Sequence, residues 1–331
     1  MEEKKVVAIT VTFNRINTLI KTIDALTKQT IQIDKIIIVD NCSNEEQKSK
    51  LKLIEQEHNN IEVVYLDSNK GGAGGFYQGM KYALEKYDPE WYWIMDDDAY
   101  PREECLEKLL ESGKNIPNIG ALCPVVHGID KMKYQMYHHK FISTYKFNDI
   151  TAVKDYNDLQ DITKIEANAF VGPLFSRKAV KEKGLPNGEL FIYGDDTEYT
   201  YRISRDFNLY LIKEAIIDHQ DIPENKNNIM PEIWWKDYYM IRNRFLFIEE
   251  FKESKIKGMF ITTYFLIKIL KQIFGTLIKR KYCGFKKIRI KLMSMAIKDG
   301  ISGRQGKTIN PIEYNKLILE KKKNLNVIVT N

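Results

Sequence analysis

The sequence predicts an α/β fold, in which a mostly parallel sheet is flanked by helices, followed by a basic helical region at the C-terminal end. Two observations predict the sheet. Short apolar runs alternate with helical patterns in the first part of the chain, and polar or acidic residues follow the ends of several of these runs. A third observation, the concentration of lysine and arginine after residue 251, sets the last part of the chain apart.

The first part of the chain alternates between strand and helix. Buried strands, each an unbroken run rich in β-branched or aromatic residues, are expected at 6–12, 36–40, 61–66 and 91–95. Helices are expected between them, at 17–26, at 45–57 and from a glycine-rich turn at 69–76 to about 87. Strands joined by helices run parallel, so their carboxyl ends share one edge of the sheet, where a binding crevice is expected.

The second part of the chain is less regular. A helix is expected at 106–114, strands are expected at 121–126, 169–175 and 209–217, and the polar, aromatic stretch 134–164 predicts no particular element. The acidic turn 191–199 leads into a helix, and from about Asn225 the pattern is helical and increasingly basic. We therefore expect a catalytic domain at 1–225 and a basic, helical region able to associate with a membrane at 226–331.

Composition narrows the class of protein. With 331 residues, 44% of them hydrophobic and 29% charged, the chain can form a full core. Its four cysteines lack CxxC spacing, so we expect reduced thiols in a cytosolic protein, with neither a disulfide framework nor a zinc site. Residues 1–5 lead directly into the first expected strand, so no signal peptide is expected.

The net charge of +6 is unevenly distributed. Residues 252–307 carry 15 basic residues against Glu253 and Asp299, a net charge of +13, so the rest of the chain carries −7. A basic tail on an acidic body predicts an anionic surface as partner, either nucleic acid or acidic lipid.

The most informative segment is 91–101, where an aromatic strand ends in Asp96, Asp97 and Asp98. Three adjacent carboxylates repel one another, and such a cluster of hard oxygen ligands suits Mg²⁺ or Mn²⁺. Alone, the triplet has a solvated acidic turn as its less favoured alternative. His219 follows another strand; a single histidine is more often structural, but beside two carboxylates it suits Mn²⁺. We expect Asp96, Asp98 and His219 to bind a metal ion, with a substrate diphosphate completing its ligands.

Two further segments suggest a site. The run Asn69 to Phe76 matches neither a dinucleotide nor a P-loop fingerprint, and it is either a flexible turn or a place where backbone near Asn69, Gly72 and Gly74 approaches a sugar diphosphate. The acids of 195–198 can simply favour the start of a helix. A pair of adjacent carboxylates in a cleft can also raise one pKa enough to accept a proton near neutral pH.

The order of these motifs is specific. Along the chain come Thr12-Phe13-Asn14-Arg15, Val39-Asp40-Asn41, the glycine run, Met95 to Asp98, Gly194 to Tyr199, and His219. This order resembles glycosyltransferase family 2, of the GT-A fold (Rossmann-like), over roughly residues 4–243. The glycine run, the tripled aspartate and the late segment 299–304 look most like the galactofuranosyltransferase branch of mycobacterial cell-wall type.

The resemblance implies inverting, metal-dependent sugar transfer with Mn²⁺ or Mg²⁺. Asp196 matches the catalytic base, with Glu198 and Asp195 at the acceptor, and Asp96, Asp98 and His219 match the metal ligands. The positions that match nucleotide-sugar contacts are Thr12, Asn14, Arg15, Asp40 and Asp97. The mycobacterial type has tryptophan directly before the paired aspartates, where this chain has Gly194.

The function expected from the resemblance is transfer of a sugar, best assigned as galactofuranose from UDP-galactofuranose, to a hydroxyl of a growing, lipid-linked cell-surface glycan. A rhamnosyltransferase using dTDP-rhamnose is the alternative. A sugar-nucleotide nucleotidyltransferase would need a basic, glycine-rich loop directly after the first strand, and Phe13 to Asn17 is not one. A lectin-like scaffold does not explain two intact acidic turns.

The segment 258–281 is very apolar but carries Lys268, Lys271 and Lys279 on one narrow stripe. These lysines argue against a membrane-spanning helix and favour an interfacial one, placing the protein in the cytoplasm, peripheral on the inner face of the membrane. The alternative is a helix buried against the catalytic domain or a sister subunit of a homo-oligomer. Nucleic acid is not an expected partner, because it leaves both acidic turns unexplained.

Overall fold

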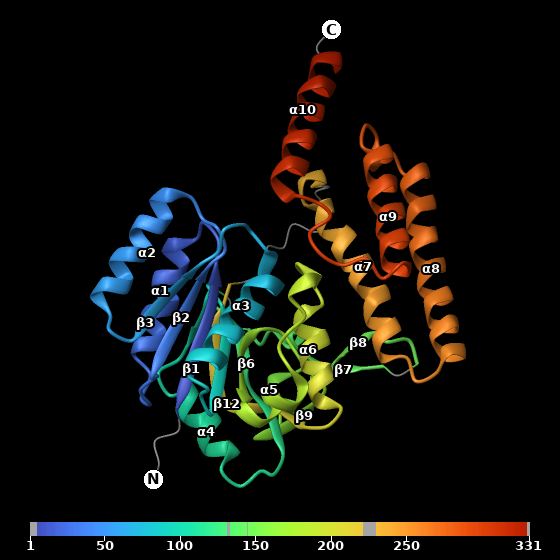
Figure 1. The fold of residues 1–331 in the computed structure, drawn as a ribbon. Helices are drawn as coiled ribbons and strands as arrows, with labels where there is room; N and C mark the ends of the chain where they lie inside the picture. Colours follow the sequence, from blue (N-terminus) through green and yellow to red (C-terminus); the bar gives the residue numbers. More distant parts are fainter. Residues whose placement is uncertain (1–4, 131–132, 144, 221–229, 330–331) are drawn as a thin grey trace. The chain divides into compact units, whose positions relative to one another are not determined.

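The computed structural model describes residues 5–130, 133–143, 145–220 and 230–329, and Figure 1 shows its ribbon. The chain forms two compact units. The first comprises residues 1–144, 148–188 and 195–222, and the second comprises 145–147, 189–194 and 223–331. The expected domain boundary between residues 225 and 226 lies outside the described residues.

The first unit begins with the expected alternation of strand and helix. Strands β1 (Val6–Thr12), β2 (Lys35–Asp40), β3 (Ile61–Tyr65) and β4 (Trp91–Asp96) are parallel, in the order β3-β2-β1-β4. Helices α1 (Ile16–Thr27), α2 (Glu45–Glu57) and α3 (Gly71–Lys86) connect them. Thr12 lies opposite Asp40, and Val11 lies opposite Asp96. The polar ends of these strands therefore meet at one edge of the sheet.

Antiparallel pairing completes a mixed nine-stranded sheet. Strand β11 (Val171–Ser176) is antiparallel to both β4 and β6 (Ile119–Gly128), and β12 (Asn208–His219) is parallel to β6. Two short strands, β5 (Ala99–Pro101) and β9 (Ile162–Ile165), pair antiparallel with β12. Helices α4 (Cys105–Gly113), α5 (Arg177–Lys183) and α6 (Asp195–Ser204) complete this unit.

Hydrophobic cores cover both faces of the sheet. Alternation along β1 sends Val6 and Ala8 to the face covered by α1 and α4, and Val7 and Ile9 to the face covered by α3, α5 and α6. Because both faces are buried, the strands are continuous apolar runs, which explains why the sequence predicts them well.

The stretch 134–164, which predicted no element, contributes to a small second sheet. Strands β7 (His139–Ile142), β8 (Asp149–Thr151) and β10 (Ala167–Asn168) pair antiparallel in the order β10-β7-β8. Each has two to four residues. Such strands are too short for an alternating pattern to be recognised in the sequence.

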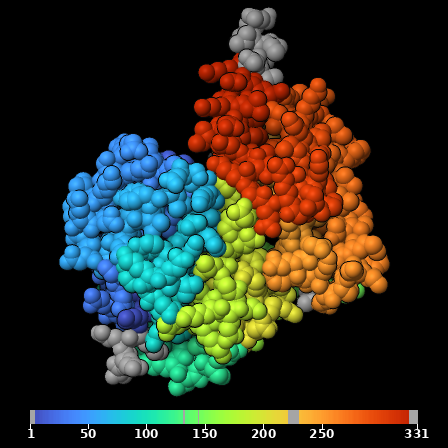
Figure 2. Space-filling view, viewed as in Figure 1, coloured from blue at the N-terminus to red at the C-terminus, as the bar shows by residue number. Residues whose placement is uncertain are grey.

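The second unit is helical in its C-terminal part, drawn in orange to red in Figures 1 and 2. It contains α7 (Trp234–Phe251), α8 (Lys255–Ile278), α9 (Lys286–Ile301) and α10 (Pro311–Val329). Its core is an aromatic and aliphatic cluster that includes Trp234, Tyr239, Ile269, Met293 and Tyr314. All four helices therefore contribute to one core.

Helix α8 differs from its neighbours in exposure. It is long and apolar enough to cross a membrane, judged by length and composition alone, although its lysines argued against a spanning segment. Large side chains such as Phe260, Ile267 and Phe274 are 66%, 48% and 63% exposed. The helix therefore leaves a broad apolar surface uncovered in the described part of the chain.

Candidate active site

The acidic triplet lies at the junction of three strands. Asp96 ends β4, Asp97 and Asp98 form a turn, and β5 returns antiparallel beside the end of β12. In this register His219 lies opposite Ala99, the residue that follows Asp98. The sequence placed His219 just after a strand; the structure makes it the last residue of β12. Strand pairing thus brings residues 121 positions apart into one site.

The expected metal ligands are close to one another. One ligand atom from each of Asp96, Asp98 and His219 lies within 4.8 Å of the other two, and His219 Nε2 is 3.4 Å from Asp98 Oδ1. His219 Nδ1 is 3.1 Å from the carbonyl oxygen of Gln220, which can only accept, so Nδ1 donates and Nε2 faces the carboxylate. Two carboxylates and an imidazole nitrogen suit Mn²⁺ or Mg²⁺.

The electrostatics of the triplet favour a bound cation. Burial, and then the Asp98 charge, raise the pKa of Asp96 to about 7. Burial alone would raise the pKa of Asp98, but hydrogen bonds from His219 and Arg15 lower it to about 2. Burial opposes protonation of His219, yet contact with Asp98 raises its pKa. A divalent cation would offset the mutual repulsion of these carboxylates.

Arg15 and Thr12 hold the middle and last aspartates. The guanidinium lies 3.0 Å from Asp97 Oδ1 and 2.5 Å from Asp98 Oδ2, and the Thr12 hydroxyl donates to Asp97 Oδ2 at 2.7 Å. Burial raises the pKa of Asp97 to about 6, although Arg15 opposes the shift. Two of the positions expected to contact the nucleotide sugar, Thr12 and Arg15, therefore contact the triplet.

Asp40 and Asn14 lie at neighbouring strand ends. Asp40 is fully buried, and its Oδ1 accepts from the Ser43 amide at 3.0 Å. Its Oδ2 is also buried and has no hydrogen-bond partner among the described residues. Asn14 adopts a positive φ of 55° and donates its amide to Ser43 Oγ. Ser43 thus fixes both residues.

The glycine segment is not the free turn that the sequence suggested, because α3 already begins at Gly71. An added Cβ at Gly75 would lie 2.4 Å from Val11, and one at Gly79 would lie 2.5 Å from Ile9. These glycines allow α3 to pack closely on β1. At Gly72, in contrast, such a Cβ would have no other group of the described part of the chain within 4 Å.

The remaining glycine-segment candidates have local contacts. The Asn69 side chain accepts from the Gly71 amide at 2.9 Å and so precedes the first turn of α3 as a cap-like group. A Cβ at Gly74 would lie 2.5 Å from the Lys70 side chain and 3.5 Å from the Gly188 carbonyl. Gly72 is therefore the most open of the three positions expected to approach a diphosphate.

The second acidic turn forms the start of α6. Asp195 is buried, and burial, followed by the Asp196 charge, raises its pKa well above the ordinary range. Asp196 is half-buried, and its Oδ1 accepts from the Thr197 amide at 2.6 Å. The Asp196 charge also acts on Asp96, and the Asp96 charge acts on Asp195. The fold thus brings the two acidic turns within electrostatic reach of each other.

Glu198 has a different environment. Its side chain is 4% exposed and pairs with Arg202, whose Nε lies 2.6 Å from Glu198 Oε1. Arg202 also donates to the carbonyl of Leu185 at 3.0 Å. The pair stabilises the first turns of α6, and an acceptor contact by Glu198 stays a prediction.

Several supporting residues carry no sequence signal. Arg102 forms two 3.0 Å hydrogen bonds to Asp218 and so fixes β5 against β12 beside the metal-type cluster. His138 packs edge-on against His219, with ring centroids 5.4 Å apart, and its Nε2 lies 2.9 Å from Gln135 Oε1. Neither residue could be predicted from periodicity. Arg102 contacts a segment far away in the sequence, and His138 lies in an irregular region.

A loop of the second unit, residues 189–194, leads directly into α6. Phe191, Tyr193 and Gly194 have positive φ values of 66°, 65° and 84°. Asn243 of α7 donates its amide to the carbonyls of Leu190, Ile192 and Tyr193 at 2.7–3.0 Å.

The neighbouring residue, Arg242, is fully buried and donates to the carbonyls of Leu190 and Gly306. Two adjacent side chains of α7 thus hold the strained loop whose next residues are Asp195 and Asp196.

Comparison with known proteins gives one family. The model of the family described as Glycosyl transferase family 2 matches residues 7–182. Galactofuranosyltransferase GlfT1 of Mycolicibacterium smegmatis is 29% identical over 203 residues, 60% of this chain and 65% of that protein. GlfT1 of Mycobacterium tuberculosis is 29% identical over 207 residues, 61% of this chain and 65% of that protein. The chain thus spans slightly under two thirds of these relatives.

Solved structures share the fold at low identity. TarS 1–349 of S. aureus aligns with a TM-score of 0.56 and 16% identity over 90% of this chain and 82% of its own. GalNAc-T7, solved with UDP, GalNAc and Mn²⁺, aligns with a TM-score of 0.55 and 18% identity over 73% of this chain and 51% of its own. The mannosyltransferase PcManGT of Pyrobaculum calidifontis aligns with a TM-score of 0.52 and 13% identity over 98% of this chain and 80% of its own. These alignments establish the GT-A fold.

Proposed function

Because the chain belongs to glycosyl transferase family 2 and is a glycosyltransferase, we propose that it transfers galactofuranose from UDP-galactofuranose, with inversion, to a hydroxyl of a growing, lipid-linked cell-surface glycan. The sequence similarity to two galactofuranosyltransferases supports this donor. The catalytic part is proposed to be residues 1–225, and 226–331 the C-terminal basic region.

One observation carries the proposal: a carboxylate–imidazole cluster at one edge of the sheet lies within electrostatic reach of a second pair of carboxylates at the start of α6. Transfer of a sugar from a nucleoside diphosphate needs both a cation site, for the leaving group, and a carboxylate base, for the acceptor. Negative charge grows on the departing diphosphate, and the acceptor hydroxyl must lose a proton as it attacks the anomeric carbon.

Asp196 is the proposed base. Its side chain is half-buried, so it remains accessible to a substrate hydroxyl, whereas its neighbour Asp195 is buried with a raised pKa. Asp196 accepts the hydroxyl proton on the face of the sugar opposite the departing diphosphate, and a single displacement then inverts the anomeric centre. Asp195 and Glu198 are proposed to face the acceptor.

The nucleotide sugar is proposed to lie along the ends of β1, β2 and β4. Asp40, Asn14 and Thr12 are proposed to hold the nucleoside; Thr12 lies opposite Asp40 in the sheet, and Ser43 links Asp40 to Asn14. Arg15 is also proposed to hold the nucleoside, Asp97 to lie near the ribose or donor sugar, and the amides near Asn69, Gly72 and Gly74 to approach the diphosphate.

The residues present fit a divalent cation. Asp96, Asp98 and His219 would hold it, since one ligand atom of each lies within 4.8 Å of the other two. When bound, Mn²⁺ or Mg²⁺ supplies positive charge that stabilises the diphosphate leaving group. Arg15 contributes a fixed positive charge at the same edge.

A donor screen tests the proposal. Purified protein with Mn²⁺ is incubated with UDP-galactofuranose, dTDP-rhamnose, UDP-glucose and UDP-galactose, and release of the nucleoside diphosphate is measured. Turnover is expected with UDP-galactofuranose. Preference for dTDP-rhamnose establishes the alternative rhamnosyltransferase, and no turnover of any donor contradicts the proposed reaction. Family membership does not favour the nucleotidyltransferase alternative.

We also propose a cytoplasmic enzyme that is peripheral on the inner face of the membrane. The exposed apolar side chains of α8 and the charge of +13 over residues 252–307 support this location. A homo-oligomer that covers the same surface is the competing possibility.

A further inference from the structure

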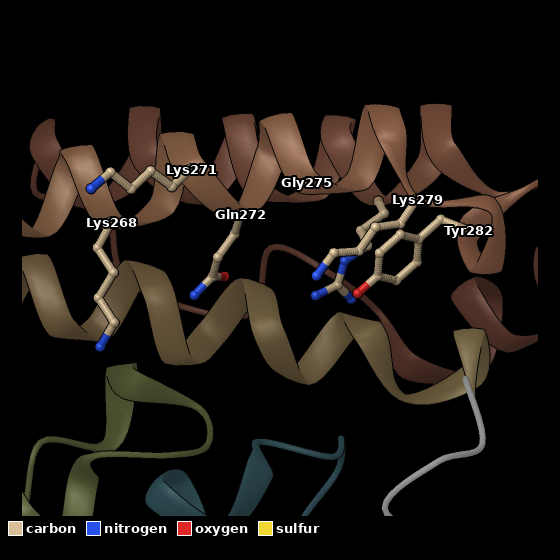
Figure 3. Close-up of a pocket in the computed structure, with 7 residues that line it drawn as sticks. Lys268, Lys271, Gln272, Gly275, Lys279 and Tyr282 are labelled. Atoms are coloured by element: carbon tan, nitrogen blue, oxygen red, sulfur yellow. The ribbon is translucent and has the colours of Figure 1, made fainter.

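A groove beside α8 in the second unit carries a concentrated positive charge. It encloses about 430 Å³ and is lined by Lys268, Lys271, Gln272, Gly275, Lys279, Tyr282 and Arg289. Figure 3 shows Lys268 and Lys271 at one end, Gln272 between, and Lys279 with Tyr282 at the other end. Among the described residues, four cationic residues and no acidic residue line this groove, which favours an anionic occupant.

The lysines of the groove are available to a ligand. Lys268, Lys271 and Lys279 are exposed, and none of them forms a salt bridge within the described residues. Arg289 is different, because its Nη1 lies 2.8 Å from Asp237 Oδ2 and its guanidinium stacks on Trp234 and Tyr282. Arg289 is thus a fixed wall of the groove, and the three lysines carry its unbalanced charge.

The floor of the groove is left open by a glycine. A Cβ added at Gly275 would meet only Lys279 Cε, at 4.0 Å. Positions 268, 271, 275 and 279 recur every three or four residues and so share one face of α8. A larger residue at 275 would occupy the space between the lysines.

The groove borders an exposed apolar surface on the same helix. Phe260, Ile267 and Phe274 are spaced seven residues apart, and each is about half or more exposed. At 100° per residue, their face lies next to the lysine face and away from buried Ile261 and Ile269. A soluble anion needs no such surface, whereas a lipid presents an anionic headgroup directly beside its acyl chains.

We propose that this groove binds the phosphate-bearing headgroup of a membrane lipid, with the apolar face of α8 inserted among the acyl chains. Three lysines would contact the phosphate oxygens as charge-assisted donors. The proposal deepens the membrane contact of the proposed function, since it assigns a defined phosphate site rather than a diffuse basic surface.

The test compares two charge-matched triple variants of the full-length protein. K268Q/K271Q/K279Q removes the lysines of the groove, and K287Q/K291Q/K298Q removes three exposed lysines of α9 outside it. Binding to phosphatidylcholine vesicles containing phosphatidic acid is measured without any sugar donor. The groove variant is expected to bind roughly 100-fold more weakly, and the control to lose no more than about tenfold. Equal losses overturn the proposal.

Two further variants test whether the shape of the groove matters and whether the bound phosphate belongs to a lipid or to a soluble anion. Gly275→Leu fills the groove without changing charge and is expected to weaken vesicle binding by at least about tenfold; unchanged binding overturns the groove as the site. F260S/F274S is expected to weaken vesicle binding but not binding of inorganic pyrophosphate measured by calorimetry. Pyrophosphate binding with no vesicle binding indicates a soluble phosphate instead and overturns the lipid.

Two other occupants remain as outcomes of the same experiments. If the wild-type protein is a dimer that F260S/F274S dissociates, a second copy covers the apolar face, and the lipid proposal is overturned. Tighter binding of a mixed-sequence RNA oligonucleotide than of the vesicles also overturns it. Because every assay omits the donor, an error in the assigned reaction leaves these results unaffected.

Discussion

Asp196 is the residue on which the proposed reaction depends most directly. Asp196→Ala is expected to lower kcat by roughly 10²–10⁴-fold, because the acceptor hydroxyl loses its base. Donor KM should change little, since the nucleotide-sugar contacts are proposed at other strand ends. Initial rates with the best donor measure both constants. Asp158→Ala, at an exposed acid of the same unit, is the control; a fully active Asp196→Ala enzyme rules out the assignment.

A buried histidine predicts a pH effect on stability. His139 is fully buried, its Nδ1 lies 2.7 Å from Asn168 Oδ1, and its Nε2 has no partner among the described residues. Burial lowers the pKa of His139 to about 4 from the ordinary 6.5. The unfolded chain therefore binds more protons between these values. The contribution of neutral His139 to the free energy of unfolding is fully present above pH 6.5 and is lost as the pH falls toward 4.

Urea unfolding at pH 7.5 and pH 5 measures this effect. His139 is expected to account for about 2 kcal/mol of the loss in the free energy of unfolding at pH 5. His139→Gln should remove that part of the pH dependence, and His58→Gln should keep it. Identical pH dependence in the wild type and His139→Gln contradicts the assignment.

At the residue scale, sequence reasoning found the groups that carry charge at strand ends. Asp96 to Asp98 stand out because adjacent carboxylates are costly without a counter-charge. Arg102 and Asn243 could not be found, because each supports the site through contacts with residues about 50 to 116 positions away. An arginine or asparagine in a helical or strand pattern predicts nothing until its partner is known.

Helix α3 is an element whose composition reflects packing. Gly79→Ala is expected to lower the free energy of unfolding by about 1–3 kcal/mol, because the new methyl group would lie 2.5 Å from Ile9 and 2.9 Å from Val39. Gly72→Ala is the matched control, because its Cβ enters open space, and stability should stay constant or rise by up to about 1 kcal/mol.

The Gly72→Ala variant also tests the donor site. If backbone near Gly72 approaches the diphosphate, Gly72→Ala should raise the donor KM while leaving the unfolding free energy intact. An unchanged KM removes Gly72 from the proposed contacts. Thermal unfolding and donor kinetics on the two variants are sufficient measurements.

The loop before α6 is a second element with a mechanical role. Asn243→Ala removes three hydrogen bonds to loop carbonyls, so it should cost about 1–3 kcal/mol of stability. Displacement of Asp196 should also lower kcat by about 10- to 100-fold. Asn310→Ala, which removes hydrogen bonds at the start of α10, should affect stability alone. Equal kcat values for both variants show that the loop contact does not position the base.

At the element scale, length decided what could be predicted. Strands β1 to β4 have five to seven residues and are mainly apolar, so the sequence identified them. Strands β5, β7, β8 and β10 have two to four residues and were missed. The glycine segment was interpreted as a turn because glycine disfavours helices, whereas close packing against β1 outweighs that preference.

The uneven charge of the whole molecule predicts a salt effect. With +13 over residues 252–307, binding to anionic vesicles should be strong at low ionic strength and largely lost near 1 M salt, where the screening length is about 3 Å. Donor hydrolysis should change far less over the same range, because Asp97, Asp98 and Asp195 are buried and so are screened less than exposed lysines. Vesicle sedimentation at several salt concentrations measures this, and salt-independent binding contradicts an electrostatic contribution.

At this scale the sequence predicted a catalytic body and a basic helical tail but not how the units share the chain. Residues 145–147 and 189–194 belong to the second unit, although both lie within the expected catalytic domain. Segments of three and six residues have no composition of their own to reveal this. Truncation after Phe251 would remove α8 to α10 and expose the aromatic core on α7, so point variants are the sharper test of the tail.

The shared loop has a consequence for the exchange of parts between related enzymes. A recombinant that joins residues 1–222 of this chain to the C-terminal helices of a relative would place a foreign helix against the carbonyls of Leu190, Ile192 and Tyr193. Such chimeras should inherit activity only when the loop and its supporting helix come from the same parent. The loop and its supporting helix, which are separated in the sequence, must therefore be exchanged together.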